Sequence, residues 1–280
     1  MTFNLRMPLL AMAGALTITA SAALADPVWD RIESTGTVVC GAIPNDPIGS
    51  WVDRETGRWE GYEVDLCRAI VEDLSEEMGQ DLEVEFRETS WANIVLDLQS
   101  QKIDIWPGMS ATEERKKALS MVGPMYNLAF CAMDGKNSDV GTTWEALNSP
   151  DVRIATVTGT SVEAAFKKMA PEAEHISLAK FSEITLAVQS GRADVMGADV
   201  LRCLNVINEA PNVFNSIFFP TPVQSMGSSA GLLKSSDRLT EWLTGWSEEH
   251  KADGTIKEIF LNVLDTAGYD PDMVPPEVQF

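Results

Sequence analysis

A polar turn that leads into an arginine is the segment of this sequence best suited to chemistry. The turn runs through Gly108, Ser110 and Thr112, and Arg115 follows in the first turn of an expected helix. The start of a helix offers unpaired backbone N–H groups and a partial positive charge. A guanidinium adds donors whose planar arrangement matches a carboxylate. The segment therefore predicts a site for a small organic anion; the alternative is a surface arginine paired with one of the two glutamates before it.

A buried strand must position this turn. Residues 103–106, Ile-Asp-Ile-Trp, are apolar enough for a buried strand, and a Pro-Gly pair ends the run. Upstream, strands are expected at 37–40 and 82–86, and helices at 62–74 and 91–99. This alternation of strands and helices argues for a parallel sheet with helices on both faces.

The same alternation returns after Tyr126. Strands are expected at 152–157 and 193–199, and helices start at Gly159-Thr160-Ser161 and at Phe181. Two similar halves imply two α/β lobes instead of one continuous sheet.

The first 25 residues have the pattern of a secretory signal peptide. Arg6 precedes an apolar run that begins at Met7 and ends in Ala23-Leu24-Ala25, a small-residue cleavage pattern. Interspersed hydroxyl residues argue against a membrane anchor, and no cysteine follows that could carry a lipid. We expect the mature chain to begin at Asp26 and to reside in the periplasm of a Gram-negative cell.

The protein is strongly acidic, with a formal net charge of −21 over 280 residues. Such a surface repels nucleic acid and anionic lipid, although it does not reveal the charge of a ligand. A hydrophobic content of 45% is normal for a packed globular protein. The proline-rich tail from Asp270 is expected to be loose.

Four cysteines lie in the expected mature chain, at Cys40, Cys67, Cys131 and Cys203. An even number in an exported protein suggests disulfides, and four cysteines allow three pairings. Cys40 ends a strand and Cys67 lies in the following helix, so these two are expected to pair, which leaves Cys131 for Cys203. No pair has metal-ligand spacing, and the sequence lacks phosphate-binding and dinucleotide-binding loops, so we expect neither a metal nor a cofactor.

The run Gly61-Tyr62-Glu63-Val64-Asp65-Leu66 resembles the signature of family 3 of the bacterial extracellular solute-binding proteins. Members of this family are periplasmic receptors of polar amino-acid ABC importers. The resemblance covers nearly all of the expected mature chain. Its other segments are Ser90-Trp91, residues 108–115, Gly159-Thr160-Ser161, residues 191–199 and Ala252-Asp253-Gly254-Thr255.

The resemblance implies a two-lobed clamp of the periplasmic-binding-protein type, with two parallel-rich sheets joined by a two-strand hinge. The chain is expected to cross near 127–131 and near 227–231. One lobe then comprises residues 26–128 and 229–280, and the other residues 129–228. The resemblance implies two partners, a small-molecule ligand and the permease of an ABC importer. The ligand lies between the lobes, which close by a hinge motion. The receptor itself is expected to be a monomer.

In this family an arginine grips the α-carboxylate of the ligand and an acidic residue takes the α-ammonium, which matches Arg115 and Asp199 on opposite lobes. Binding a zwitterion across the cleft would couple capture to closure. The other positions matched to the ligand are Trp91, Gly108, Ser110, Thr160 and Ser161. Several of these assignments have structural alternatives, because Asp199 could cap the next helix, Thr160 and Ser161 could be ordinary caps, and Trp91 could be core packing.

Two departures from the family pattern leave the side-chain specificity open. Trp106 and Pro107 are bulky where the family often has small aliphatic residues. The loop from Pro44 to Glu60 carries Asn45–Trp51 in place of the common aromatic wall.

An enzyme is the competing class. Gly227-Ser228-Ser229-Ala230-Gly231 fits a hydrolase motif, with Asp237 and His250 following in a triad order. Leu232 and Leu233 read as a strand, where the motif needs a turn and a helix, and His250 is expected to face solvent, so we interpret the match as chance. A cyclohexadienyl dehydratase-like enzyme or a ligand sensor for a membrane receptor is the alternative to a non-enzymatic import receptor.

Overall fold

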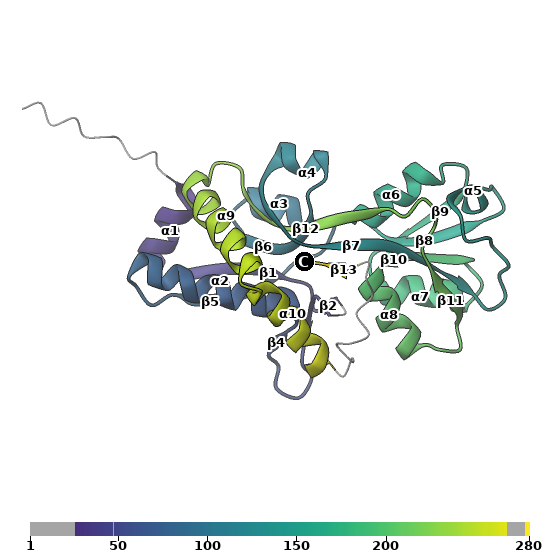
Figure 1. Ribbon diagram of the computed structural model, residues 1–280, viewed down its shortest axis with the longest axis horizontal. Coiled ribbons are helices and arrows are strands. Elements are labelled where there is room, and N and C mark those ends of the chain that lie inside the picture. The colour runs from purple at the N-terminus through teal and green to yellow at the C-terminus, as the bar shows by residue number, and fades with distance from the viewer. Residues whose placement is uncertain (1–25, 47, 268–277) are drawn as a thin grey trace, which may run out of the picture.

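The computed structural model describes residues 26–46, 48–267 and 278–280, and it consists of two α/β lobes joined by two long strands (Figure 1). The joining strands are β7 (Leu119–Gly135) and β12 (Ser225–Leu233). The predicted fold class, a two-lobed α/β clamp, is therefore confirmed. The predicted signal peptide lies outside the described residues.

The first lobe is built on a parallel sheet in the order β5-β1-β6. Its helix α2 (Tyr62–Met78) shows why the sequence folds this way, because Leu66, Ile70 and Leu74 recur at helical spacing and are fully buried. The other elements of this lobe are α1 (Pro27–Thr35), β1 (Thr37–Ala42), β5 (Glu83–Glu88), α3 (Ile94–Gln99), β6 (Ile105–Ser110), α4 (Glu113–Ala118), α9 (Asp237–Ala252) and α10 (Thr255–Thr266).

The second lobe repeats the pattern, with β8 pairing in parallel to both β9 and β10. The buried residues of its strands are mostly apolar, and the fully buried Phe166 of α6 belongs to the same hydrophobic cluster. The elements are α5 (Trp144–Leu147), β8 (Arg153–Val157), α6 (Ser161–Met169), β9 (Glu174–Leu178), α7 (Phe181–Gln189), β10 (Val195–Asp199), α8 (Val200–Glu209) and β11 (Phe214–Phe218).

The two lobe sheets meet on β7, so a single path runs β5-β1-β6-β12-β7-β10-β8-β9. Along β7 the antiparallel partner is β12 as far as Ala129, and it becomes β10 from Phe130. The strand thus passes from one lobe to the other without a turn. The exact limits of the lobes, at 128/129 and 228/229, remain predictions.

The predicted loop between Pro44 and Glu60 contains a small antiparallel sheet of three strands, β2 (Asn45–Asp46), β3 (Ser50–Val52) and β4 (Trp59–Glu60). Strands of two or three residues carry no readable alternation, so the prediction of a plain loop was wrong here. Gly61 closes this unit with φ +120°, and a Cβ at that position would lie 2.4 Å from the Gly49 carbonyl oxygen.

Both predicted disulfides are confirmed. Cys40–Cys67 joins β1 to α2, with Cα atoms 6.6 Å apart. Cys131–Cys203 joins the crossing strand β7 to α8, with Cα atoms 6.7 Å apart. Each disulfide therefore fixes a helix to a strand of its lobe.

The end of the chain differs from the predicted loose tail. Residues 268–277 lie outside the described part, but Val278–Gln279 form β13, which pairs with β7 at Leu128 and Asn127. The Phe280 ring packs 5.1 Å from that of Phe260. A loose tail is thus the wrong prediction for these last residues, because an edge of β7 is available to pair with them.

Candidate functional site

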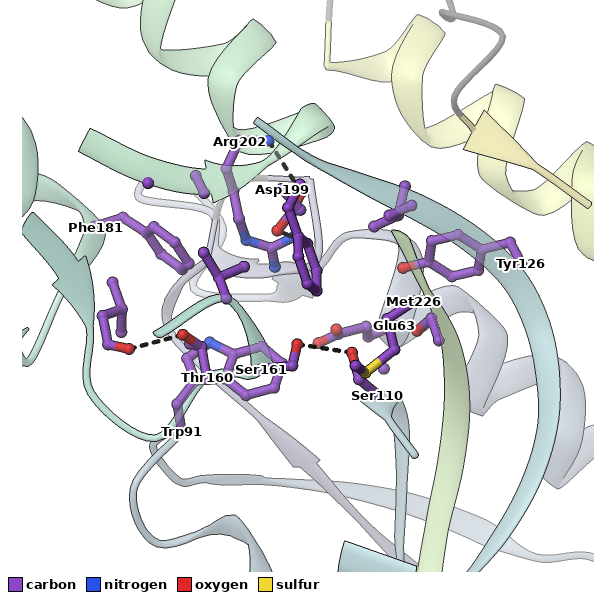
Figure 2. Close-up of a pocket in the computed structure, with 18 residues that line it drawn as sticks. Glu63, Trp91, Ser110, Tyr126, Thr160, Ser161, Phe181, Asp199, Arg202 and Met226 are labelled. Carbon is purple, nitrogen blue, oxygen red and sulfur yellow. Dashed lines mark hydrogen bonds and ion pairs between the residues drawn. The ribbon is translucent and has the colours of Figure 1, made fainter. Parts of the chain in front are cut away.

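A cavity lies between the two lobes, and residues of both line it (Figure 2). It encloses about 580 Å³, counted with its opening to solvent. β6 and α2 contribute from the first lobe, β8, α6, β10 and α8 from the second, and β7 and β12 from the crossing. The lining residues are Glu63, Trp91, Gly108, Ser110, Tyr126, Leu128, Phe130, Val157, Thr160, Ser161, Val162, Phe181, Gly197, Ala198, Asp199, Arg202, Met226 and Ser228.

Hydroxyl groups from the two lobes meet at one end of this cavity. The Oγ atoms of Ser110 and Ser161 lie 2.9 Å apart, within hydrogen-bond distance (Figure 2). Thr160 caps α6, since its Oγ1 accepts from the Glu163 backbone N–H at 3.1 Å, and Glu163 in turn accepts from the Gly159 N–H. The start of α6 therefore faces the cavity with two hydroxyls, a chemistry that suits a carboxylate.

Gly108 has a steric reason to be glycine. A Cβ at this position would lie 1.8 Å from Oε1 of Glu63. The bare backbone of β6 thus lets a buried carboxyl of α2 reach the cavity wall.

Arg115 does not line the cavity but lies directly behind its hydroxyl end. Its guanidinium donates to the carbonyl oxygens of Ser110 and Gly159, each at 3.0 Å, and so connects the two lobes. The side chain is buried, and burial lowers its pKa to about 10. A threonine caps this short helix, with Oγ1 of Thr112 accepting from the Arg115 N–H. Contact between Arg115 and a ligand carboxylate remains a prediction.

At the other end of the cavity, Asp199 ends β10 and caps α8. Its Oδ1 accepts from the backbone N–H groups of Leu201 and Arg202 at 3.2 and 3.3 Å. Its Oδ2 accepts from the Arg202 guanidinium at 2.9 Å. The structural alternative for Asp199, a helix cap, is therefore present, and its predicted contact with a ligand ammonium remains a prediction.

Arg202 is the main residue that sequence reasoning missed. Its guanidinium also bonds Asp46, which belongs to the other lobe, and both side chains are almost fully buried, at 6% and 0% exposure. The Asp199–Arg202 spacing of three residues could have indicated a helical ion pair. Nothing local in the sequence indicated Asp46, because 156 positions separate it from Arg202.

Burial and neighbouring charges set the titration of this cluster. Burial raises the pKa of Asp46 to about 6, although Arg202 opposes that rise. Burial also raises the pKa of Glu63 well above its usual range, and the Asp46 carboxylate raises it further. For Arg202, burial acts to lower the pKa, but the carboxylates of Asp199 and Asp46 outweigh it and hold the pKa above its ordinary value. The cluster thus places the carboxyl groups of Glu63, Asp46 and Asp199 around the single guanidinium of Arg202.

Trp91 both lines the cavity and packs in the core, so its two interpretations coexist. Its ring meets that of Trp106 edge-on at 5.6 Å, and its Nε1–H donates to Asp46 at 3.2 Å. The Arg115 guanidinium lies 5.8 Å from the Trp91 ring centre. Six apolar side chains also line the cavity, those of Leu128, Phe130, Val157, Val162, Phe181 and Met226.

The hydrolase-like motif has no nucleophile elbow. Gly227–Gly231 runs inside β12, a strand paired on both sides. His250 is mostly buried and its Nε2 lies 2.9 Å from Asp73, so the prediction that it faces solvent was wrong. Among residues 26–46, 48–267 and 278–280, no group of three acidic, histidine or cysteine side chains is arranged to hold a metal ion.

The fold and the interlobe cavity define a two-lobed solute-binding protein. The sequence model of the bacterial extracellular solute-binding proteins, family 3, matches residues 38–264. The chain belongs to that family. Within the described ranges, no helix combines the length and hydropathy that a membrane crossing requires.

Named relatives of the chain are binding proteins. It is 25% identical to a probable amino-acid ABC transporter-binding protein of Haemophilus influenzae, over 88% of this chain and 90% of the relative. The fold is similar to the solute receptor for L-cysteine of Neisseria gonorrhoeae, with a TM-score of 0.75, 25% identity and coverage of 90% and 98% of the two chains. It is also similar to an ancestral amino acid-binding protein described as a precursor of cyclohexadienyl dehydratase, with a TM-score of 0.72, 29% identity and coverage of 82% and 96%.

Proposed function

We propose that this protein is a periplasmic receptor that captures an amino acid between its lobes and delivers it to the permease of an ABC importer. The observation that carries the proposal is the interlobe cavity, which has hydroxyls backed by a buried arginine at one end and an acidic cluster at the other. A zwitterion has the complementary pair of charges. The same proposal includes that the chain is cleaved before Asp26 and exported. It also includes that the receptor is a monomer and does not catalyse a reaction.

The carboxylate of the ligand is assigned to the hydroxyl end. Ser110 and Ser161 supply hydroxyls there, and the start of α6, which Thr160 caps, adds backbone N–H groups with a partial positive charge. Arg115 contributes its charge from behind Ser110, where burial leaves that charge little screened by solvent.

The ammonium of the ligand is assigned to the acidic end. Asp46 and Asp199 share the single guanidinium of Arg202. Two carboxyl groups paired with one cation leave acceptor capacity for an ammonium. Because Asp46 belongs to the first lobe and Asp199 to the second, a ligand held at this end would strengthen the contact between the two lobes. This differential contact favours the closed arrangement.

A thermal-unfolding screen of the exported protein against the twenty amino acids tests the proposal. A ligand at a hundred times its Kd is expected to stabilise the protein by about 2.7 kcal/mol. Citrate and glucose serve as control solutes of different chemistry. Mass spectrometry of the bound ligand should recover it unchanged. No stabilisation by any amino acid would contradict the proposal, and turnover of prephenate would replace it with the dehydratase alternative.

A further inference from the structure

Arg202 brings a cation of the protein itself into the ligand cavity. The side chain extends from α8, and its guanidinium lies beside the Asp199 carboxylate and faces the same space as Phe181 (Figure 2). The pair with Asp46 crosses from one lobe to the other.

The guanidinium is held in place on several sides. Nη1 of Arg202 donates to Asp199 at 2.9 Å, and Nη2 donates to Asp46. The Phe181 ring centre lies 5.0 Å from the guanidinium carbon. Gly49 closes the remaining side, since a Cβ there would lie 3.1 Å from Nη2 of Arg202. A group enclosed in this way has few other rotamers open to it, so a ligand does not easily displace it.

A cationic side chain on the ligand would therefore find Asp46 and Asp199 already engaged by Arg202. The α-ammonium of the ligand takes the acceptor capacity that these two carboxyl groups still have. A second positive charge would lie unpaired in a buried site and close to a fixed guanidinium, and both effects oppose binding. Leu128, Phe130 and Met226 offer an apolar surface to the side chain of the ligand.

We propose that Arg202 determines the specificity of this receptor by occupying the place of a cationic ligand group, so that amino acids with uncharged side chains bind and arginine and lysine do not. The inference rests on the proposed function and specifies its substrate class. Arg202 thus acts as an internal counterion that the ligand cannot replace.

The test compares wild type with Arg202→Leu, Arg202→Gln and Arg202→Lys by calorimetric titration with L-arginine, L-lysine, L-glutamine and L-cysteine. Arg153→Leu is the matched control, because it breaks an Arg–Asp pair with Asp194 that lies away from the cavity. Wild type, Arg202→Lys and the control should prefer an uncharged amino acid over both cationic ones by at least tenfold. Removal of the charge in Arg202→Leu or Arg202→Gln should improve arginine or lysine binding relative to the uncharged ligand by at least tenfold.

The wild-type panel decides the inference even if the neutral variants fail to fold. Wild type that binds arginine or lysine within tenfold of its best uncharged ligand overturns the role of Arg202 and leaves the proposed function intact. A folded Arg202→Leu with unchanged preferences overturns it as well. If wild type binds no amino acid at all, the proposed function falls and the inference falls with it.

Discussion

Asp26, the residue expected to begin the mature chain, caps two helices with one carboxylate. Its Oδ1 accepts from the N–H groups of Val28 and Trp29 at the start of α1, at 3.1 and 3.0 Å. Its Oδ2 accepts from those of Arg238 and Leu239 at the start of α9, at 2.9 and 3.2 Å. The carboxylate therefore fastens the N-terminal helix to a helix more than 200 positions later in the chain.

The substitution Asp26→Ala is expected to lower the free energy of unfolding by about 2–4 kcal/mol. Loss of one helix cap costs about 1 kcal/mol, and a buried N–H left without an acceptor adds about 1–3 kcal/mol. Asp26 is 4% exposed, so water replaces the lost acceptors poorly. Asp26→Asn should lose about half as much, since an amide oxygen can still cap one helix.

Urea unfolding of the exported protein, followed by tryptophan fluorescence, measures these changes. Asp30→Ala is the matched control, because Asp30 is an exposed carboxylate in the first turn of the same helix. This control should lose less than about 1 kcal/mol, the size of an exposed helix-dipole interaction. An Asp26→Ala variant as stable as the Asp30→Ala variant would refute the double-cap argument.

Three further predictions concern the site and its support. Arg115→Ala should abolish the thermal stabilisation by the amino-acid ligand, whereas Arg153→Ala, which is remote from the cavity, should keep it. Replacing Cys131 and Cys203 together by alanine should lower the free energy of unfolding by about 4 kcal/mol, because the disulfide closes a loop of 72 positions; a loss under 1 kcal/mol in urea unfolding would contradict this. The pKa of Asp46 is raised in the folded state, to about 6 from 3.8, so its contribution to stability is full below pH 4 and is lost as the pH rises to 6. The free energy of unfolding of Asp46→Asn should therefore be closer to that of wild type at pH 7 than at pH 4. A difference between the two proteins that does not depend on pH would contradict the raised pKa of Asp46.

Local signals in the sequence predicted the parts of the molecule that depend on local contacts. Helical spacing located α2. The pairing of Cys40 with Cys67 followed from a strand and the helix after it. Such features join residues close in sequence, and their physical rules act over a few positions.

The acidic end of the cavity could not be predicted in the same way. Asp46 and Arg202 meet only because the lobes come together, and neither belongs to a recognisable motif. Glu63 lies within the family signature, yet its position against Gly108 depends on the packing of α2 on β6. The strand β13 was missed for a similar reason, because its partner is a free edge of β7.

The continuity of β7 has a consequence for how this receptor can evolve. Tyr126, Leu128 and Phe130 alternate along the strand and all line the cavity, so the strand that joins the two lobes is also part of the cavity wall. A substitution that alters the twist of this segment changes the room offered to the solute. At these three positions, a change in the connection between the lobes is therefore also a change in the binding cavity, and selection on one acts on the other.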